Sequence, residues 1–166
     1  MYKSLLILLL LISTVSSQDK WDIYSKDYNF GLTPKETIKQ NIYNGYDVYD
    51  RDYNFGLSPR KQIKKEFGNN YEVYDKEYFY GLVPKQKIEQ DYSGNYRVYD
   101  KEYNYGLIPK ITVKKYNDNE FQIYDKEYNY GLTPKQIIKN RSDGTIEVYD
   151  KDYNFGLTPK KVIKKR

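Results

Sequence analysis

Residues 48–59 read VYDRDYNFGLSP, and the rest of the chain is organised around copies of this stretch. The stretch recurs six times, and its glycine and proline return every 25 residues with no insertion or deletion. The glycines and prolines of the six copies are Gly31, Pro34, Gly56, Pro59, Gly81, Pro84, Gly106, Pro109, Gly131, Pro134, Gly156 and Pro159. A constant period of this length is typical of repeat architectures, in which each unit buries its apolar face against its neighbours.

The first segment of each repeat predicts a β-strand. Residues 46–49 (YDVY) are aromatic and β-branched and alternate in polarity, and we expect the strand to continue into the following Asp/Asn stretch. Gly56 then allows backbone conformations that a side chain would oppose. Pro59 lacks an N–H donor and forces the residue before it towards extended geometry. Each glycine and proline pair therefore predicts a structural corner.

The second segment, after the proline, has two interpretations. Thr33 and Pro34 resemble a helix start, with a threonine cap and a proline in the first turn. Val83 and Ile108 occupy the same cap position, however, and neither side chain can cap a helix. Residues 111–113 (ITV) alternate and are β-branched, which favours a strand.

Segments rich in Asn, Asp and Gly join each repeat to the next and predict hairpin turns. If residues 142–144 form a three-residue loop, Ile138 faces Val148 and Lys139 faces Glu147. This register pairs apolar groups on one face and opposite charges on the other, which stabilises a sheet.

These patterns predict an all-β fold, an array or solenoid of six hairpin-like repeats with two short strands each. The alternative is one short strand plus one short helix per repeat. We expect a repeat domain over residues 18–166, with repeats at approximately 21–45, 46–70, 71–95, 96–120, 121–145 and 146–166.

The N-terminus predicts a cleaved signal peptide over residues 1–17. One lysine precedes the apolar run at residues 5–12, and small residues follow it at 13–17. The run is much shorter than the roughly 20 residues that a membrane-spanning helix needs. We therefore expect secretion, to the cell surface, the periplasm or beyond, and no transmembrane segment in the mature chain.

The composition argues against an enzyme. The chain has no cysteine and no histidine, so it lacks a thiolate metal site, the commonest general base and the commonest metal ligand; carboxylate and lysine chemistry stay open, and no cofactor is predicted. Lys and Arg total 28 against 23 Asp and Glu. This small, interleaved surplus argues against nucleic acid as a partner.

A calcium site is one hypothesis for the acidic stretch. Its D-x-D-x-N spacing is that of oxygen-donor calcium loops, but the twelfth position from Asp50 is Lys61, where such loops place a glutamate. The alternative is the polar side of a strand paired with lysines. The candidate ligands are Asp50, Asp52, Asn54, Asp150, Asp152 and Asn154.

The repeated tyrosines form a second candidate site. They could stack on sugars from the surface, but we favour a role as the aromatic core of the repeats, which are poor in aliphatic residues. The set is Tyr49, Tyr53, Tyr74, Tyr78, Tyr99, Tyr103, Tyr124, Tyr128, Tyr149 and Tyr153. Separately, Asn140 begins an N-glycosylation sequon, Asn-Arg-Ser.

The leading functional hypothesis is a non-enzymatic secreted or cell-surface repeat protein. It would act in adhesion, binding or matrix assembly through an extended aromatic and charged β surface. The alternatives are a glycan- or cell-wall-binding module and a calcium-dependent structural protein. The candidate partners are a second copy of the chain and an extracellular surface or glycan.

Overall fold

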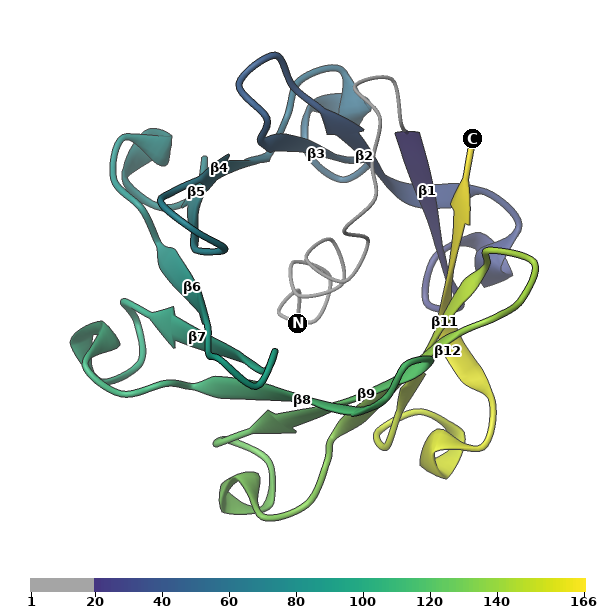
Figure 1. The fold of residues 1–166 in the computed structure, drawn as a ribbon. Helices are drawn as coiled ribbons and strands as arrows, with labels where there is room; N and C mark the ends of the chain where they lie inside the picture. The colour runs from purple at the N-terminus through teal and green to yellow at the C-terminus, as the bar shows by residue number, and fades with distance from the viewer. Residues whose placement is uncertain (1–19) are drawn as a thin grey trace.

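A computed structural model describes residues 20–166, so the predicted signal peptide lies outside the described residues. Within this range, twelve antiparallel strands form a closed barrel in which each strand pairs with its neighbours in sequence (Figure 1). The all-β prediction, with two strands per repeat, is confirmed. The strands are β1 (Lys20–Ser25), β2 (Pro34–Gln40), β3 (Tyr46–Asp50), β4 (Lys61–Lys65), β5 (Tyr71–Asp75), β6 (Gln86–Gln90), β7 (Tyr96–Asp100), β8 (Ile111–Asn117), β9 (Glu120–Asp125), β10 (Gln136–Asn140), β11 (Ile146–Asp150) and β12 (Pro159–Lys165).

The core lies on the inner face of the barrel wall, where a belt of Ile and Val packs together with aromatic side chains such as Trp21. Alternate residues along each strand are buried, as in β3, where Tyr46, Val48 and Asp50 are buried and the residues between them are not. Each repeat contributes two β-branched residues to the belt, such as Val48 and Ile63. Branched side chains of this kind fit a pleated wall that is packed on one face.

The hairpin register predicted from charge pairing is confirmed. Ile138 lies opposite Val148 and Lys139 opposite Glu147. The N–H of Arg141 donates to the carbonyl of Thr145 at 2.8 Å, which closes the loop. Local pairing energetics were therefore sufficient to predict this part of the sheet.

The predicted tandem hairpin repeats are present, but they close into a barrel and do not stack as a solenoid. β1 pairs with β12, with Ile23 opposite Ile163, so the first and last repeats meet and the ring closes. The physical reason is that closure pairs the backbone groups of both edge strands, which an open sheet would leave exposed.

The helix alternative for the second segment is wrong, because this segment forms the even-numbered strands. Within the described chain, the helical turns lie before the proline instead and are three residues long. They are η1 (Asn29–Gly31), η2 (Asn54–Gly56), η3 (Phe79–Gly81), η4 (Asn104–Gly106), η5 (Asn129–Gly131) and η6 (Asn154–Gly156). The first strand of each repeat correspondingly ends at its Asp, such as Asp50, or at Ser25 in the first repeat, and does not extend through the Asp/Asn stretch.

The barrel has two ends of different construction. Each loop that carries an η turn joins an odd strand to the next even strand, and each tight hairpin joins an even strand to the next odd one. All η loops therefore lie at one end, called the corner end, and all hairpins at the other, called the hairpin end. The corners are residues 26–33, 51–58, 76–83, 101–108, 126–133 and 151–158.

Candidate binding surface at the corner end

Every corner contains three successive residues with left-handed backbone. In the second repeat these are Asn54 (φ 46°), Phe55 (φ 54°) and Gly56 (φ 72°). The N–H of Gly56 donates to the Tyr53 carbonyl and the N–H of Leu57 to the Asn54 carbonyl, both at 2.9 Å. Asn and Gly tolerate this conformation, but a bulky residue such as Phe adopts it rarely and at a cost of about 1–2 kcal/mol.

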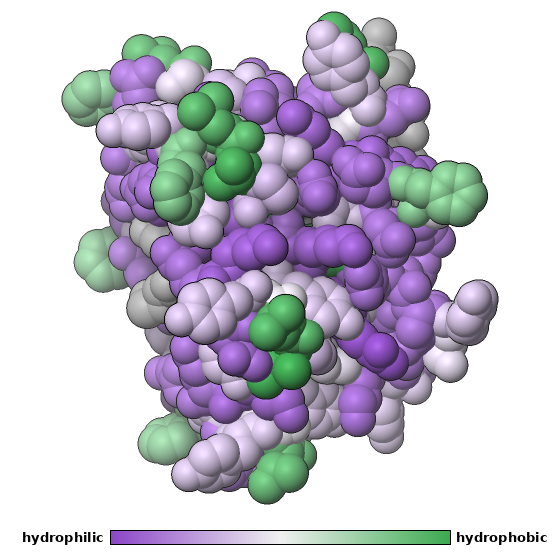
Figure 2. All heavy atoms as spheres, turned by 90° about the vertical axis from the view of Figure 1, so that its left-hand side faces the viewer, coloured by the Kyte–Doolittle hydropathy of each residue, from purple (hydrophilic) through white to green (hydrophobic). Residues whose placement is uncertain are grey.

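The left-handed aromatic residue and the leucine two positions later point into solvent. The aromatic side chains are 81–83% exposed and the leucines 75–79% exposed. Figure 2 shows apolar groups that stand apart from one another on a hydrophilic surface. The set, called the corner ring below, is Phe30, Leu32, Phe55, Leu57, Tyr80, Leu82, Tyr105, Leu107, Tyr130, Leu132, Phe155 and Leu157.

A circle of ion pairs links neighbouring repeats beneath the corner ring. The basic residue after each corner proline pairs with an acidic residue in the next repeat, as in Lys85 with Glu102 at 2.9 Å. The other pairs are Lys35 with Asp52, Arg60 with Glu77, Lys110 with Glu127, Lys135 with Asp152, and Lys160 with Asp27. The last pair joins the sixth repeat to the first, so the ion pairs form a complete circle, as the strands of the sheet do.

Asp50, a candidate calcium ligand, belongs to this circle. Its side chain is 1% exposed and lies 2.8 Å from both Lys35 Nζ and Arg60 Nη1. The N–H of Asp52 also donates to its carboxylate at 3.0 Å. Burial disfavours ionisation, but the hydrogen bonds from Lys35, Asp52 and Arg60 outweigh it and lower the pKa of Asp50.

The other calcium candidates also have protein partners. Asp52 pairs with Lys35, and the Asn54 amide donates to Ser58 Oγ at 2.9 Å. In the sixth repeat, the Gln136 amide donates to Asp150 at 2.6 Å, Asp152 pairs with Lys135, and Asn154 donates to Thr158. Among residues 20–166, no group of three or more acidic side chains is arranged to hold a metal ion.

The predicted tyrosine stripe lies outside the core, contrary to our preferred interpretation. Tyr49, Tyr74, Tyr99, Tyr124 and Tyr149 alternate with buried residues and lie half-buried on the outer face. Most face a lysine ammonium, which is 4.5 Å from the ring centre for Lys39 over Tyr49 and 4.1 Å for Lys64 over Tyr74. These cation–π contacts cover part of the ring surface that a ligand would need.

The second tyrosine set lies half-buried at the base of the corners. Tyr53, Tyr78, Tyr103, Tyr128 and Tyr153 directly precede the η turns. Three of them, Tyr78, Tyr103 and Tyr128, face basic residues of the ion-pair circle, such as Lys110, whose Nζ lies 5.1 Å from the Tyr103 ring centre. These tyrosines therefore support the corner.

The predicted corner glycines occupy the turn and the predicted prolines directly follow the corner, with Pro34 and Pro159 beginning β2 and β12, but sequence reasoning missed the side chains that the turn presents. The corner glycines have φ between 71° and 75°. The missed signal is the aromatic residue directly before each glycine, at a position where no strand follows to bury it. Asn140, the sequon residue, is half-buried at the end of β10, and its N–H donates to the Asn119 carbonyl at 2.8 Å.

No protein family matches this chain, and no curated protein is significantly similar to it. No helix among the described residues combines the length and apolar character needed to cross a membrane.

Proposed function

We propose that this chain is a non-enzymatic secreted or cell-surface protein that binds a repetitive partner surface through the corner ring. The observation that carries the proposal is the sixfold display of one exposed aromatic–leucine pair. Single exposed apolar side chains are ordinary on a protein surface, so it is the repetition of the same pair in all six corners, and not the size of one apolar patch, that supports an interaction site. Several equivalent sites on one rigid body increase avidity without any new type of contact.

Backbone strain supports the same proposal. Each corner places a Phe or Tyr in a left-handed conformation, yet the ring is not buried and returns no packing energy to the fold. Strained residues of this kind are concentrated at binding and catalytic sites. Asn or Gly would fit the same backbone with less strain, so the aromatic side chain serves something other than folding.

A glycan is the second candidate partner. Phe30, Phe55 and Phe155 occupy the position that Tyr fills in the other corners, so the shared feature is the ring face and not the hydroxyl. A ring face is the part of an aromatic side chain that stacks on a sugar. Calcium-dependent assembly has less support, because Lys35 and Arg60 already neutralise Asp50.

The proposal is tested by removing corner rings in steps. One variant carries Asn in place of Phe30, Phe55 and Phe155, and a second variant replaces all six corner aromatics with Asn. Self-association is measured by sedimentation velocity, and surface binding by cosedimentation with insoluble cellulose and chitin. We expect a partial loss in the first variant and a loss of more than about tenfold in the second, since the sites act together.

The matched control removes three rings from the outer face, with Tyr49, Tyr74 and Tyr124 changed to Leu. This control should retain binding. Equal binding by the wild-type protein and the six-corner variant would refute the proposal. So would a wild-type protein that stays monomeric and binds neither surface.

A further inference from the structure

A second site lies inside the corner end of the barrel and contains none of the corner-ring residues. It is a cavity of about 440 Å³ whose lining includes Ser25, Tyr28, Glu36 and Lys161. Ile111 and Ile123 line it as well, from β8 and β9. This volume is within the range of ordinary small-molecule sites.

One inward position of the repeats varies strongly in chemistry and contributes four residues to the cavity wall. The belt position is always Ile or Val, as at Ile38 and Ile63, but the inward position two residues earlier changes from repeat to repeat. That position holds Glu36, Lys61, Gln86, Ile111, Gln136 and Lys161. Although the barrel is built of repeats, its interior therefore lacks rotational symmetry. An asymmetric interior can bind a small ligand in one orientation.

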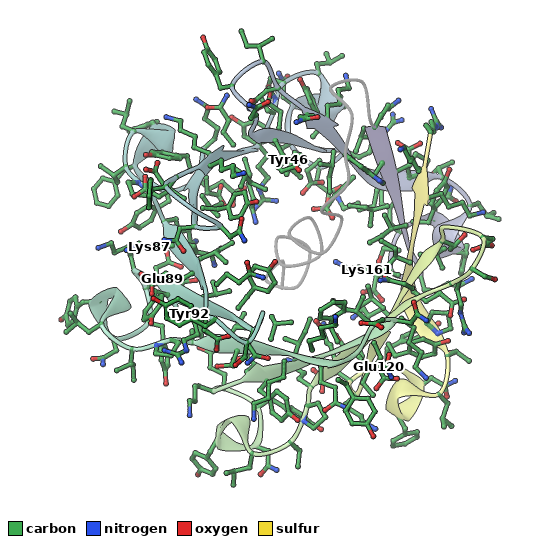
Figure 3. The ribbon with its side chains drawn as sticks, viewed as in Figure 1. Tyr46, Lys87, Glu89, Tyr92, Glu120 and Lys161 are labelled. Carbon is green, nitrogen blue, oxygen red and sulfur yellow. The ribbon has the colours of Figure 1, made fainter. Side chains whose placement is uncertain are left out.

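Glu36 and Lys161 present opposite charges to the cavity without pairing to each other. Glu36 is 5% exposed and Lys161 is half-buried, and within residues 20–166 neither side chain forms a hydrogen bond or an ion pair with another residue. Figure 3 shows Lys161 pointing into the barrel, whereas Lys87 and Glu89 lie on the outside of the wall, where they pair at 2.8 Å. Burial raises the pKa of Glu36, and the nearby Lys161 opposes that rise.

Ser25 makes room between these two charges. It faces Lys161 across β1 and β12, and Glu36 faces Ile23 on the other side of β1. The other five repeats place an Asp where the first has Ser25. In the second repeat that Asp is Asp50, which fills the space and binds the neighbouring Lys35 and Arg60. In the first repeat the smaller side chain of Ser25 occupies this position, so the space stays open.

We propose that this cavity binds a small zwitterion of the α-amino acid class. Its ammonium would pair with Glu36, its carboxylate with Lys161, and its apolar side chain would lie towards Ile111 and Ile123. A neutral ligand would leave the buried charge of Glu36 and the half-buried charge of Lys161 unpaired, and a ligand of single charge would leave one of them unpaired, which is unfavourable. The proposal does not depend on the function of the corner ring.

The test compares three ligands by calorimetric titration of the purified protein. L-leucine carries both charges, L-leucinamide carries only the ammonium, and N-acetyl-L-leucine carries only the carboxylate. We expect L-leucine to bind at least about tenfold more tightly than either derivative, which corresponds to about 1.4 kcal/mol. No binding of L-leucine at about 10 mM, or equal binding of all three, would overturn the proposal.

Variants assign the two charges separately. The Glu36→Gln variant should bind L-leucine and N-acetyl-L-leucine with similar affinity, because the partner of the ammonium is gone. The Lys161→Gln variant should bind L-leucine and L-leucinamide with similar affinity, because the partner of the carboxylate is gone. Lys164→Gln is the matched control, because Lys164 is exposed on the same strand. It should bind like the wild-type protein, and a loss of binding there would refute the assignment to the inner face.

Ser25→Asp provides a variant that the fold should accept. It restores the residue of the other five repeats and fills the gap between Glu36 and Lys161. We expect it to melt at or above the wild-type temperature and to lose L-leucine binding by more than tenfold. If it folds and binds L-leucine as the wild-type protein does, the cavity is not the site.

Discussion

The corner end and the hairpin end are built by the same six repeats, but only the corner end is uniform. The left-handed aromatic residue has φ of 52–55° in every corner of the described chain. The hairpins differ in both sequence and backbone, with left-handed residues at Asn44, Gly68, Gly94 and Gly144 in four of them and a register shift between Lys115 and Asn117 in the fifth. A hairpin has only to join two strands, and several turns can do so.

The difference separates two roles within the corner. The ion-pair circle explains why the basic and acidic residues recur, since each repeat must hold the next, as Lys85 holds Glu102. It does not explain the aromatic residue and the leucine, which are exposed and take no part in it. The aromatic residue and the leucine recur in every corner without a structural role, and we therefore assign them to binding.

The largest expected effect comes from the ion-pair circle. Asp50→Asn removes a buried charge from Lys35 and Arg60 and should lower the free energy of unfolding by about 3 kcal/mol. Urea denaturation measures the change. Asp91→Asn is the matched change at the hairpin end, where Asp91 accepts from the N–H groups of Ser93 and Asn95 in an exposed turn. A loss at Asp91 as large as that at Asp50 would contradict the structural difference between the two ends.

Substitution of Gly45 at the hairpin end should be more harmful than substitution of Gly56 at the corner end. A Cβ on Gly45 would lie 2.2 Å from the Ile63 carbonyl oxygen, so backbone must move, whereas a Cβ on Gly56 meets nothing closer than 3.7 Å. We expect Gly45→Ala to lower stability by about 2–3 kcal/mol through overpacking. Gly56→Ala should lose about 1 kcal/mol through its left-handed backbone alone. The reverse order in urea denaturation would be inconsistent with this geometry.

Glu36 should reverse the usual pH dependence of a carboxylate. Its pKa is raised, first by burial and then by Asp50 on β3, against opposing effects of Lys161 on β12, Lys61 on β4 and Lys35 on β2. Because the pKa of Glu36 is higher in the folded state than in the unfolded state, the protonated form stabilises the fold. This contribution is fully present below the unfolded-state pKa of 4.5 and is lost as pH rises through the folded-state pKa. Glu36→Gln should therefore melt higher than the wild-type protein at pH 7.

The pH series supplies the control for this prediction. The advantage of Glu36→Gln should shrink as pH falls and vanish below the ordinary glutamate pKa of 4.5. Glu89→Gln changes an exposed glutamate that is paired with Lys87 on the outer face, so it should give no gain at pH 7. A gain that persists at low pH would show that burial of the Glu36 charge is not its cause.

The smallest expected effect concerns a hydrogen bond inside the corner. Asn129 donates to Thr133 Oγ1 at 3.1 Å, and the fourth repeat has Ile108 in the equivalent acceptor position. The backbone is nonetheless the same, with φ of 53° at Tyr130 and 54° at Tyr105. Thr133→Val should therefore change stability by less than about 0.5 kcal/mol in urea denaturation. A larger loss would show that this exposed bond holds the corner.

The elements of the sheet could be predicted from sequence because their signals are local. Alternation in residues 46–49 and charge pairing around Lys139 and Glu147 identified strands and register correctly. Closure could not be predicted in this way, because it depends on twist summed over twelve strands, which determines whether β1 meets β12.

The candidate sites were harder to predict than the fold. The predicted tyrosines looked like core residues, but the inner face is formed by Ile and Val, such as Val48, together with other aromatic residues near the start of the odd-numbered strands, such as Trp21 and Tyr46. Phe55 looked like part of a strand, and only the left-handed turn shows that it points outward. Ser25 was visible as a departure from the repeat, but its neighbours Glu36 and Lys161 come from opposite ends of the sequence and meet only when the barrel closes.

The central claim is that the corner aromatics serve binding and not folding. The most direct test is the guanidinium unfolding midpoint of the variant with Asn at all six corner aromatic positions. Since Asn tolerates left-handed backbone better than Phe or Tyr, the midpoint should equal or exceed that of the wild-type protein. A midpoint lowered to the extent expected for lost core residues, equivalent to more than about 3 kcal/mol, would contradict the claim.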